Sequence, residues 1–353
     1  ALACAVPSLL ASGYQWDSVR IGGGGFVTGI IPNASVPGLV YARTDVGGAY
    51  RWDAPNASWI PLNDWTPRET SEFLGVESLA TDPTFPNRLY MVVGWWYNDQ
   101  NQTAFLRSDD YGSTFEVFNV TSQFRVHGNG MGRQNGEKLQ IDPNNPDILY
   151  CGSRNRGIFK SLDRGATWTR LDALDITTTA TGNGVAFVTL DPSSGANGAT
   201  QTLYAGISRV GENLYRSTDG GATFTPIAGG PANLMPQRGA LASDGSLYLT
   251  YGNGAGPHAQ GAFPYDQGGI WKYNTSSDTW TNITPAGFAN AFCGISVDPA
   301  DPLRVIASST QIWYPQDGAY GDRFFLSTNG GATWIDLVER GFDMDPDGVT
   351  WIE

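Results

Sequence analysis

Residues 161–168 read Ser-Leu-Asp-Arg-Gly-Ala-Thr-Trp, and the pattern Ser-x-Asp-x-Gly-x-Thr-aromatic recurs along the chain. The interval between the third and fourth clear copies is about twice the others, which predicts a decayed copy between them. The sequence therefore consists of tandem copies of one unit. The clear copies, followed by two degenerate copies in the same phase, lie at 108–115, 161–168, 217–224, 327–334, 271–280 and 50–59.

A second marker runs in step with the first: an apolar stretch ends in Asp-Pro and is followed by Leu-Tyr. The clearest copies begin at Asp82, Asp142 and Asp191. Each unit is therefore expected to contain a strand, an Asp-Pro turn, two further strands, the Ser-x-Asp turn and a fourth strand. In that second turn Asp accepts backbone N–H groups, Gly adopts a positive φ and the aromatic residue anchors the next strand. We interpret the motif as structural.

Four antiparallel strands in a unit of roughly 55 residues is the spacing of a β-propeller blade. Six units are visible, and a seventh begins at Asp345 and is cut off near Glu353. We predict an all-β chain that forms a seven-bladed β-propeller of four-stranded antiparallel blades with Asp-box turns, the last blade being incomplete. The propeller domain is expected to occupy residues 14–353.

The first 13 residues are apolar and end in a small-x-small pattern at Ala11 and Gly13. This pattern is typical of a secretory signal peptide, so we interpret residues 1–13 as its remnant, with a packed N-terminal strand as the alternative. Asn-x-Ser/Thr sequons also favour a secreted, extracellular protein that carries N-glycans on its surface. Their asparagines are Asn33, Asn56, Asn101, Asn119, Asn274 and Asn282.

The composition argues against several classes of function. The formal net charge is −13 and no basic run occurs, so we expect no nucleic-acid partner and favour a neutral polysaccharide over a polyanion. No later stretch reaches the roughly 18 apolar residues of a membrane span, so no membrane partner is expected. The 2 histidines and 3 cysteines are too dispersed for a metal site, and we expect no metal and no cofactor.

Two strings are more specific than the repeated turns. They are Gly22-Gly-Gly-Gly-Phe-Val-Thr-Gly-Ile30 and Tyr41-Ala-Arg-Thr-Asp45-Val-Gly-Gly-Ala-Tyr-Arg51. With them, the chain from Tyr14 onward resembles glycoside hydrolase family 74, which comprises xyloglucanases and reducing-end-specific xyloglucan cellobiohydrolases, and we expect a secreted enzyme of fungal type. The resemblance implies two seven-bladed propellers that face each other across a cleft for a β-1,4-glucan.

The resemblance also implies an inverting mechanism in which Asp45 is the general base and the general acid comes from the second propeller. Inversion requires a base that activates water on one face of the sugar and an acid that protonates the leaving oxygen on the other. We find no second half in this sequence. The 353-residue chain alone is therefore expected to bind the glucan and to hydrolyse it very poorly.

Arg43 lies two residues before Asp45 on the same face of a predicted strand, and it is expected to hold that carboxylate or a sugar hydroxyl. The alternative is a structural salt bridge. Sugar rings stack on aromatic side chains, so aromatic residues in loops are candidate glucan contacts, with packing between blades as the alternative for each. These candidates are Trp65, Trp95, Trp96, Tyr97, Trp313 and Tyr314.

His127 lies in the glycine-rich stretch 126–133 and is a candidate sugar contact, with a solvent-facing loop histidine as the alternative. Glu77 and Glu137 each precede an Asp-Pro strand at a similar position. Their repetition at one phase favours a structural role near the propeller axis.

Two other functions remain open. A non-catalytic propeller that binds carbohydrate or another partner fits the missing second carboxylate. A sialidase-type hydrolase shares the repeated turn, but it needs three arginines for the sialate carboxylate and a Tyr nucleophile, an arrangement that we do not find. Replacing Asp45 by Asn separates an enzyme from a binding module.

Overall fold

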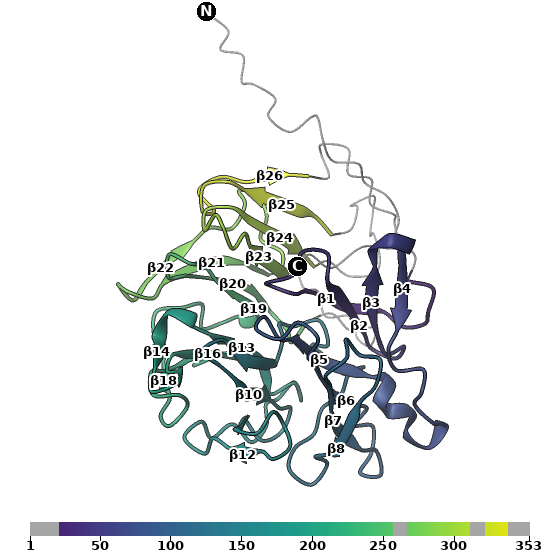
Figure 1. Ribbon diagram of the computed structural model, residues 1–353. Coiled ribbons are helices and arrows are strands. Elements are labelled where there is room, and N and C mark those ends of the chain that lie inside the picture. Colours follow the sequence, from purple (N-terminus) through teal and green to yellow (C-terminus); the bar gives the residue numbers. More distant parts are fainter. Residues whose placement is uncertain (1–20, 257–266, 311–321, 338–353) are drawn as a thin grey trace, which may run out of the picture.

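The computed structural model describes residues 21–256, 267–310 and 322–337, and these form six four-stranded antiparallel sheets. The sheets are arranged as blades around a common centre, with the first strand of each blade inside and the fourth at the rim (Figure 1). The all-β propeller with four-stranded blades is thus confirmed. The described residues hold six blades, however, and not the seven expected. The seventh, expected from Asp345, and the leader at residues 1–13 lie outside the described residues.

The blades follow one another along the chain. Blade 1 comprises β1 (Val27–Pro32), β2 (Val40–Thr44), β3 (Ala49–Asp53) and β4 (Ser58–Pro61). Blade 2 comprises β5 (Val76–Thr81), β6 (Leu89–Gly94), β7 (Thr103–Ser108) and β8 (Glu116–Asn119). Blade 3 comprises β9 (Leu139–Asp142), β10 (Asn145–Gly152), β11 (Ile158–Ser161) and β12 (Thr169–Arg170). Blade 4 comprises β13 (Val185–Leu190), β16 (Leu203–Ile207), β17 (Leu214–Ser217) and β18 (Thr225–Pro226).

The last two described blades have the same order. Blade 5 comprises β19 (Met235–Leu241), β20 (Ser246–Gly252), β21 (Gly268–Asn274) and β22 (Thr279–Asn282). Blade 6 comprises β23 (Phe292–Val297), β24 (Val305–Ser309), β25 (Phe324–Ser327) and β26 (Ile335–Asp336). The connections add a small ladder and three short 3-10 helices, namely β14 (Gly195–Ala196), β15 (Ala199–Thr200), η1 (Ala54–Asn56), η2 (Arg68–Leu74) and η3 (Pro192–Ser194).

Burial falls from the inner strands to the rim. Every residue of β6 and of β20 is buried, because each of these strands is covered on both faces by neighbouring blades. The fourth strand β8 is largely exposed. The apolar cores accordingly lie between blades: Tyr90 and Phe105 of blade 2 share one cluster with Leu139, Phe159 and Trp168 of blade 3.

The repeated turn joins each blade to the one before it. In blade 3 the Asp163 carboxylate accepts hydrogen bonds from the Thr167 N–H at 2.9 Å and its hydroxyl at 2.6 Å. Gly165 has φ +82°, and a Cβ there would lie 2.0 Å from the Phe105 ring. Trp168 packs edge-on against the same ring at 5.2 Å between centroids. These contacts give the motif the structural role that we assigned to it.

The strand order separates two sets of loops. In an antiparallel blade the turns after the first and third strands lie at one end of the strands, and those after the second and fourth lie at the other. The Asp-Pro and Ser-x-Asp turns therefore share one end. The loops after β2, β6, β8 and β10, which hold Asp45, Trp95, His127 and Arg154, share the opposite end. Within the described residues, no helix is long and apolar enough to span a membrane.

Candidate active site

Asp45 lies in the turn between β2 and β3, and the residues around it explain the string Arg-Thr-Asp-Val-Gly-Gly. The Thr44 hydroxyl accepts the Gly47 N–H and donates to the Gly48 carbonyl, both at 2.8 Å. Gly48 has φ +82°, which favours glycine. A Cβ on Gly47 would lie 1.7 Å from the Gly24 carbonyl oxygen, so this turn packs directly on the first glycine-rich string.

The Asp45 carboxylate is surrounded by donors, and its side chain is only 8% exposed. One oxygen accepts the Phe26 backbone N–H at 2.7 Å, and the other lies 3.3 Å from Nε of Arg133. Trp95 donates its indole N–H to the Asp45 carbonyl oxygen at 2.9 Å. Both carboxylate contacts stabilise negative charge.

Arg43 does not hold Asp45. Its Nε pairs with Glu137 Oε1 at 2.7 Å, and its Nη1 donates to the Thr28 hydroxyl at the same distance. The Arg43 side chain is 1% exposed and the second Glu137 oxygen accepts the Leu79 N–H, so the pair belongs to the structural centre of the propeller. The structural salt bridge is therefore correct, and direct contact with the Asp45 carboxylate is wrong.

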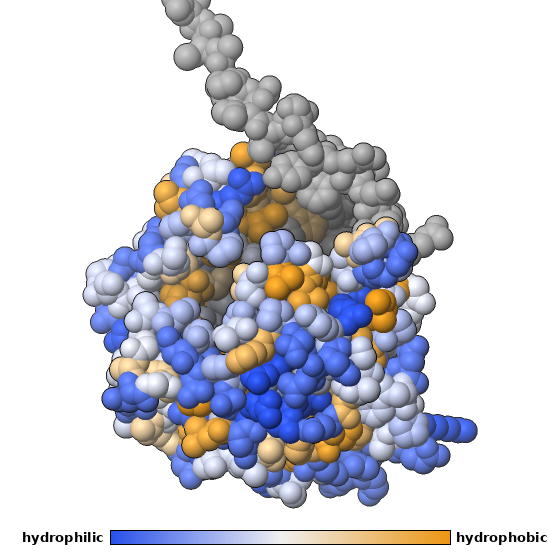
Figure 2. All heavy atoms as spheres, viewed as in Figure 1, coloured by the Kyte–Doolittle hydropathy of each residue, from blue (hydrophilic) through white to orange (hydrophobic). Residues whose placement is uncertain are grey.

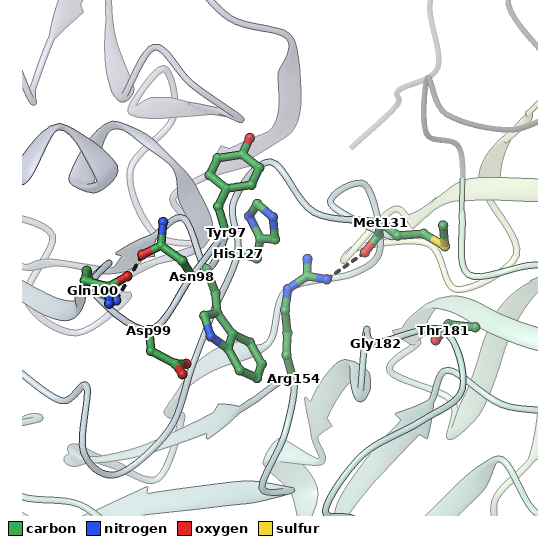
Figure 3. Close-up of a pocket in the computed structure, with 10 residues that line it drawn as sticks. Tyr97, Asn98, Asp99, Gln100, His127, Met131, Arg154, Thr181 and Gly182 are labelled. Atoms are coloured by element: carbon green, nitrogen blue, oxygen red, sulfur yellow. Dashed lines mark hydrogen bonds between the residues drawn. The ribbon is translucent and has the colours of Figure 1, made fainter.

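An open pocket of about 630 Å³ lies beside the Asp45 turn. Three predicted contacts, Trp96, Tyr97 and His127, line it together. The Tyr97 ring meets the His127 ring edge-on at 4.5 Å between centroids, and Tyr97 is 60% exposed. Figure 3 shows Tyr97, His127 and Arg154 side by side. The full lining is Trp96, Tyr97, Asn98, Asp99, Gln100, His127, Met131, Arg154, Thr181 and Gly182.

The other predicted contacts lie elsewhere. Trp65 is 43% exposed, but its ring packs against Phe115 at 6.0 Å between centroids and does not line this pocket. Trp95 does not line the pocket either, because its indole N–H is bound to the Asp45 backbone. Asp45 itself is not a lining residue; Trp95, directly before Trp96, connects it to the pocket wall. Trp313 and Tyr314 lie outside the described residues.

A buried ion cluster underlies the pocket. Glu77, whose side chain is 1% exposed, accepts two hydrogen bonds from Arg154 at 2.8 and 2.9 Å and pairs with Lys138 at 2.5 Å. It also accepts the His127 N–H at 2.7 Å. Thus Glu77 and Glu137 both have the structural role predicted for them. One carboxylate of blade 2 fixes the backbone of His127 and the side chain of Arg154.

Burial sets the electrostatics of this cluster. Burial alone would raise the pKa of Glu77, but Arg154 and Lys138 outweigh it and hold that pKa well below its usual range. Burial lowers the pKa of Lys138 to about 8, although Glu77 acts in the opposite direction. Burial likewise lowers the pKa of Arg133, with Asp45 opposing the shift. Near pH 7 Glu77 and Arg133 are therefore both charged.

The sequence did not single out Arg133 and Arg154 as functional residues. Arg133 ends the glycine-rich stretch in which His127 was noticed, and Arg154 follows the second strand of blade 3 as Asp45 follows that of blade 1. Aligning the repeats by phase would have found Arg154. The described residues contain no group of three or more His, Cys, Asp or Glu that could hold a metal ion.

The chain is similar in sequence to known xyloglucanases. A scan of family models found no match. A xyloglucanase of Paenibacillus sp is 42% identical over 348 residues, which is 92% of this chain and 32% of that protein. The chain is therefore a homologue of the glycoside hydrolase family 74 enzymes, as its sequence predicted.

Two solved structures of family 74 enzymes have a similar fold over most of this chain. The family 74 enzyme of Niastella koreensis superposes with a TM-score of 0.83 at 49% identity, covering 90% of this chain and 46% of that one. The family 74 xyloglucanase of Xanthomonas campestris superposes with a TM-score of 0.81 at 36% identity, covering 92% of this chain and 47% of that one. The chain thus spans from about a third to just under half of the length of these relatives.

Proposed function

We propose that this chain is the propeller that carries the general base of an inverting xyloglucan hydrolase, and that Asp45 is this base. The contact that supports the proposal most directly is the hydrogen bond from Trp95 to the Asp45 carbonyl oxygen, at 2.9 Å. It joins the turn of the only carboxylate in the family-specific string to a pocket lined by Trp96, Tyr97 and His127. The relatives named as xyloglucanases supply the substrate class.

The pocket suits a sugar polymer, because the rings of a glucan have apolar faces and hydroxyl rims. Exposed Tyr97 and half-buried Trp96 supply aromatic surface, while Asn98, Gln100 and Thr181 supply polar groups. On the face seen in Figure 2, hydrophilic side chains gather where Figure 1 places β10, with smaller apolar patches around them. The glucan is proposed to run along the loops that follow the second and fourth strands of blades 1 to 4, which include those after β2, β6, β8 and β10.

The proposed chemistry needs a second carboxylate. A water molecule held by Asp45 attacks the anomeric carbon and passes its proton to the carboxylate, while an acid on the other side of the ring protonates the leaving oxygen. Glu77 is buried against Arg154 and Lys138, and the two oxygens of Glu137 are bound by Arg43, Ser78 and the Leu79 N–H, so neither is this acid. We propose that the acid comes from a second propeller, in keeping with the longer chains of the relatives.

The test is xyloglucan hydrolysis by two proteins, the 353-residue chain and a hybrid in which it replaces the matching part of the Niastella koreensis enzyme. We expect the chain alone to bind xyloglucan with very slow turnover and the hybrid to hydrolyse it. Asp45→Asn should lower kcat of the hybrid by about 10²- to 10⁴-fold. Asp147→Asn, an exposed aspartate at the opposite end of blade 3, is the matched control and should change nothing. Normal turnover by Asp45→Asn would refute the assignment.

The second candidate function is a non-catalytic carbohydrate-binding propeller. It is favoured by the burial of Asp45, by the Phe26 N–H on one carboxylate oxygen and by the Arg133 ion pair on the other. In that case Asp45→Asn leaves both binding and the hybrid's turnover unchanged. The sialidase alternative loses support, because Arg43, Arg133 and Arg154 are each paired with their own carboxylate and do not form a common anion site.

We also propose that the protein is exported and that its exposed sequons carry N-glycans. Asn56, Asn119 and Asn282 are exposed and suit this role. Asn33 does not: it is 6% exposed, and its Nδ2 donates to the Thr81 hydroxyl and the Asp82 carbonyl. The expectation of a surface position is thus wrong for Asn33. Sequencing the N-terminus of the protein recovered from its native culture medium tests export.

A further inference from the structure

The Asp45 carboxylate is fixed by Arg133, which lies in the loop between β8 and β9. The Arg133 Nε is 3.3 Å from one Asp45 oxygen, and the guanidinium lies over the Phe26 ring, 5.6 Å from its centroid. The backbone N–H of Phe26 binds the other Asp45 oxygen at 2.7 Å. Arg133 and Phe26 therefore contact each other and hold one oxygen each.

Arg133 is itself held in place by the centre of the propeller. Arg43 Nη1 donates to the Arg133 carbonyl oxygen at 3.0 Å, and Arg43 is anchored by Glu137. On the other side of the loop, a Cβ on Gly132 would lie 2.4 Å from Asn183, so the chain there cannot shift outward. The buried pair of Arg43 and Glu137 thus fixes the backbone that carries Arg133.

Asp45 is the carboxylate that pairs with Arg133. The groups that face it are Asp45, Tyr97 and Arg154, and the last of these is engaged by Glu77. Among the described residues, Asp45 is the one carboxylate within ion-pair distance of Arg133. Both side chains are nearly inaccessible to water, which strengthens their attraction relative to an exposed pair.

We propose that Arg133 is a positioning residue for Asp45, whose carboxylate it holds in one orientation in the turn between β2 and β3. This inference rests on the proposed function. A base that activates water depends on exact placement, and a misplacement of about 1 Å can cost two orders of magnitude in rate. Arg133 is not expected to contact the sugar, so its loss should act on turnover and leave binding largely intact.

The experiment compares Arg133→Met and Arg133→Lys in the hybrid enzyme described above. We expect Arg133→Met to lower kcat by about 10- to 100-fold with KM changed by less than about twofold. Its pH–rate profile should also differ from that of the parent, because the variant lacks the positive charge beside the carboxylate. Arg133→Lys keeps the charge and should recover much of kcat and the original profile. Arg88→Met is the matched control and should keep kcat, since Arg88 lies over Phe85 at 4.0 Å and pairs with Asp109 in the turns at the opposite end of the blades.

Three results would overturn the inference. In the first, Asp45→Asn abolishes turnover but Arg133→Met retains the parent kcat and pH profile, so the inference alone fails. In the second, both Arg133 variants lose kcat, substrate affinity and thermal stability together, so Arg133 is only structural. In the third, Asp45→Asn hydrolyses normally, so the proposed function fails and the inference with it. If Arg133→Met does not fold, Arg133→Lys decides by its pH profile and its KM.

Discussion

Replacing Glu77 by Gln should destabilise the protein more than any other single charge removal in the cluster beneath the pocket. The change strands two cations, since the Arg154 and Lys138 side chains are 3% and 2% exposed. Removing one partner of a buried ion pair costs about 3–5 kcal/mol, and a domain is stable by only about 5–15 kcal/mol. Gln keeps one acceptor oxygen for the His127 N–H, but its amide nitrogen faces the Arg154 Nη2 and Lys138 donors, so the loss includes both the charge and those hydrogen bonds.

The free energy of unfolding is measured by urea denaturation at pH 7 and pH 9. The pKa of Lys138 is lowered to about 8 by burial, against the influence of Glu77, so at pH 9 much of its charge is already gone. The variant should therefore lose less stability at pH 9 than at pH 7. Adding Lys138→Met removes one stranded cation and should recover part of the loss. Asp175→Asn, in an exposed pair with Arg170, is the control and should cost well under 1 kcal/mol. A loss below about 0.5 kcal/mol for Glu77→Gln would refute the reasoning.

Four further predictions concern the acid dependence of Glu77, the repeated turn, the pocket and the sequons. Because the pKa of Glu77 is held low, its contribution to stability should be present above about pH 4.5 and lost as the pH falls below, so parent and Glu77→Gln should converge in acid urea titrations. Gly165→Ala, which drives a methyl into the Phe105 ring, should cost about 1–3 kcal/mol more in urea denaturation than Gly198→Ala, whose Cβ meets nothing within 4 Å. Tyr97→Ala should weaken xyloglucan binding roughly 2- to 10-fold by calorimetry, whereas Trp65→Ala should not. Secreted from a eukaryotic host, the protein should show glycan at Asn56 and none at Asn33 by peptide mass spectrometry.

The repeats predicted the blades well because their information is local. Each Ser-x-Asp turn closes through hydrogen bonds within a few residues, as Asp163 does with Thr167. The two decayed copies also form the expected hairpins, β3 with β4 and β21 with β22. Trp96, Tyr97 and His127 could be proposed as sugar contacts because they occupy loops, and the structure places all three in the lining of one pocket.

Contacts between blades were beyond the sequence. Arg43 and Glu137 are 94 residues apart, and the local sequence pattern does not predict that Arg43 pairs with Glu137 and not with the nearby Asp45. Side chains alternate between the two faces only within a strand, and β2 ends at Thr44. Asp45 lies beyond that end, so its two-residue spacing from Arg43 does not put the two side chains on one face. Asn33 matched a sequon, but its side-chain Oδ1 accepts the Ser35 and Val36 N–H groups in the turn after β1, and its Nδ2 donates to the Asp82 carbonyl oxygen of blade 2.

The strand order has a consequence for how such a protein can diversify. Assembly contacts, such as those of Asp163 and Trp168, are concentrated in the turns at one end of the blades. The loops at the other end can accordingly lengthen, shorten or change their side chains while the ring still closes. Only the few loop residues tied to the axis, among them Arg154 and Lys138, are held fixed. New sugar preferences can thus arise when the loops between these fixed residues are exchanged, while the strands of the propeller stay the same.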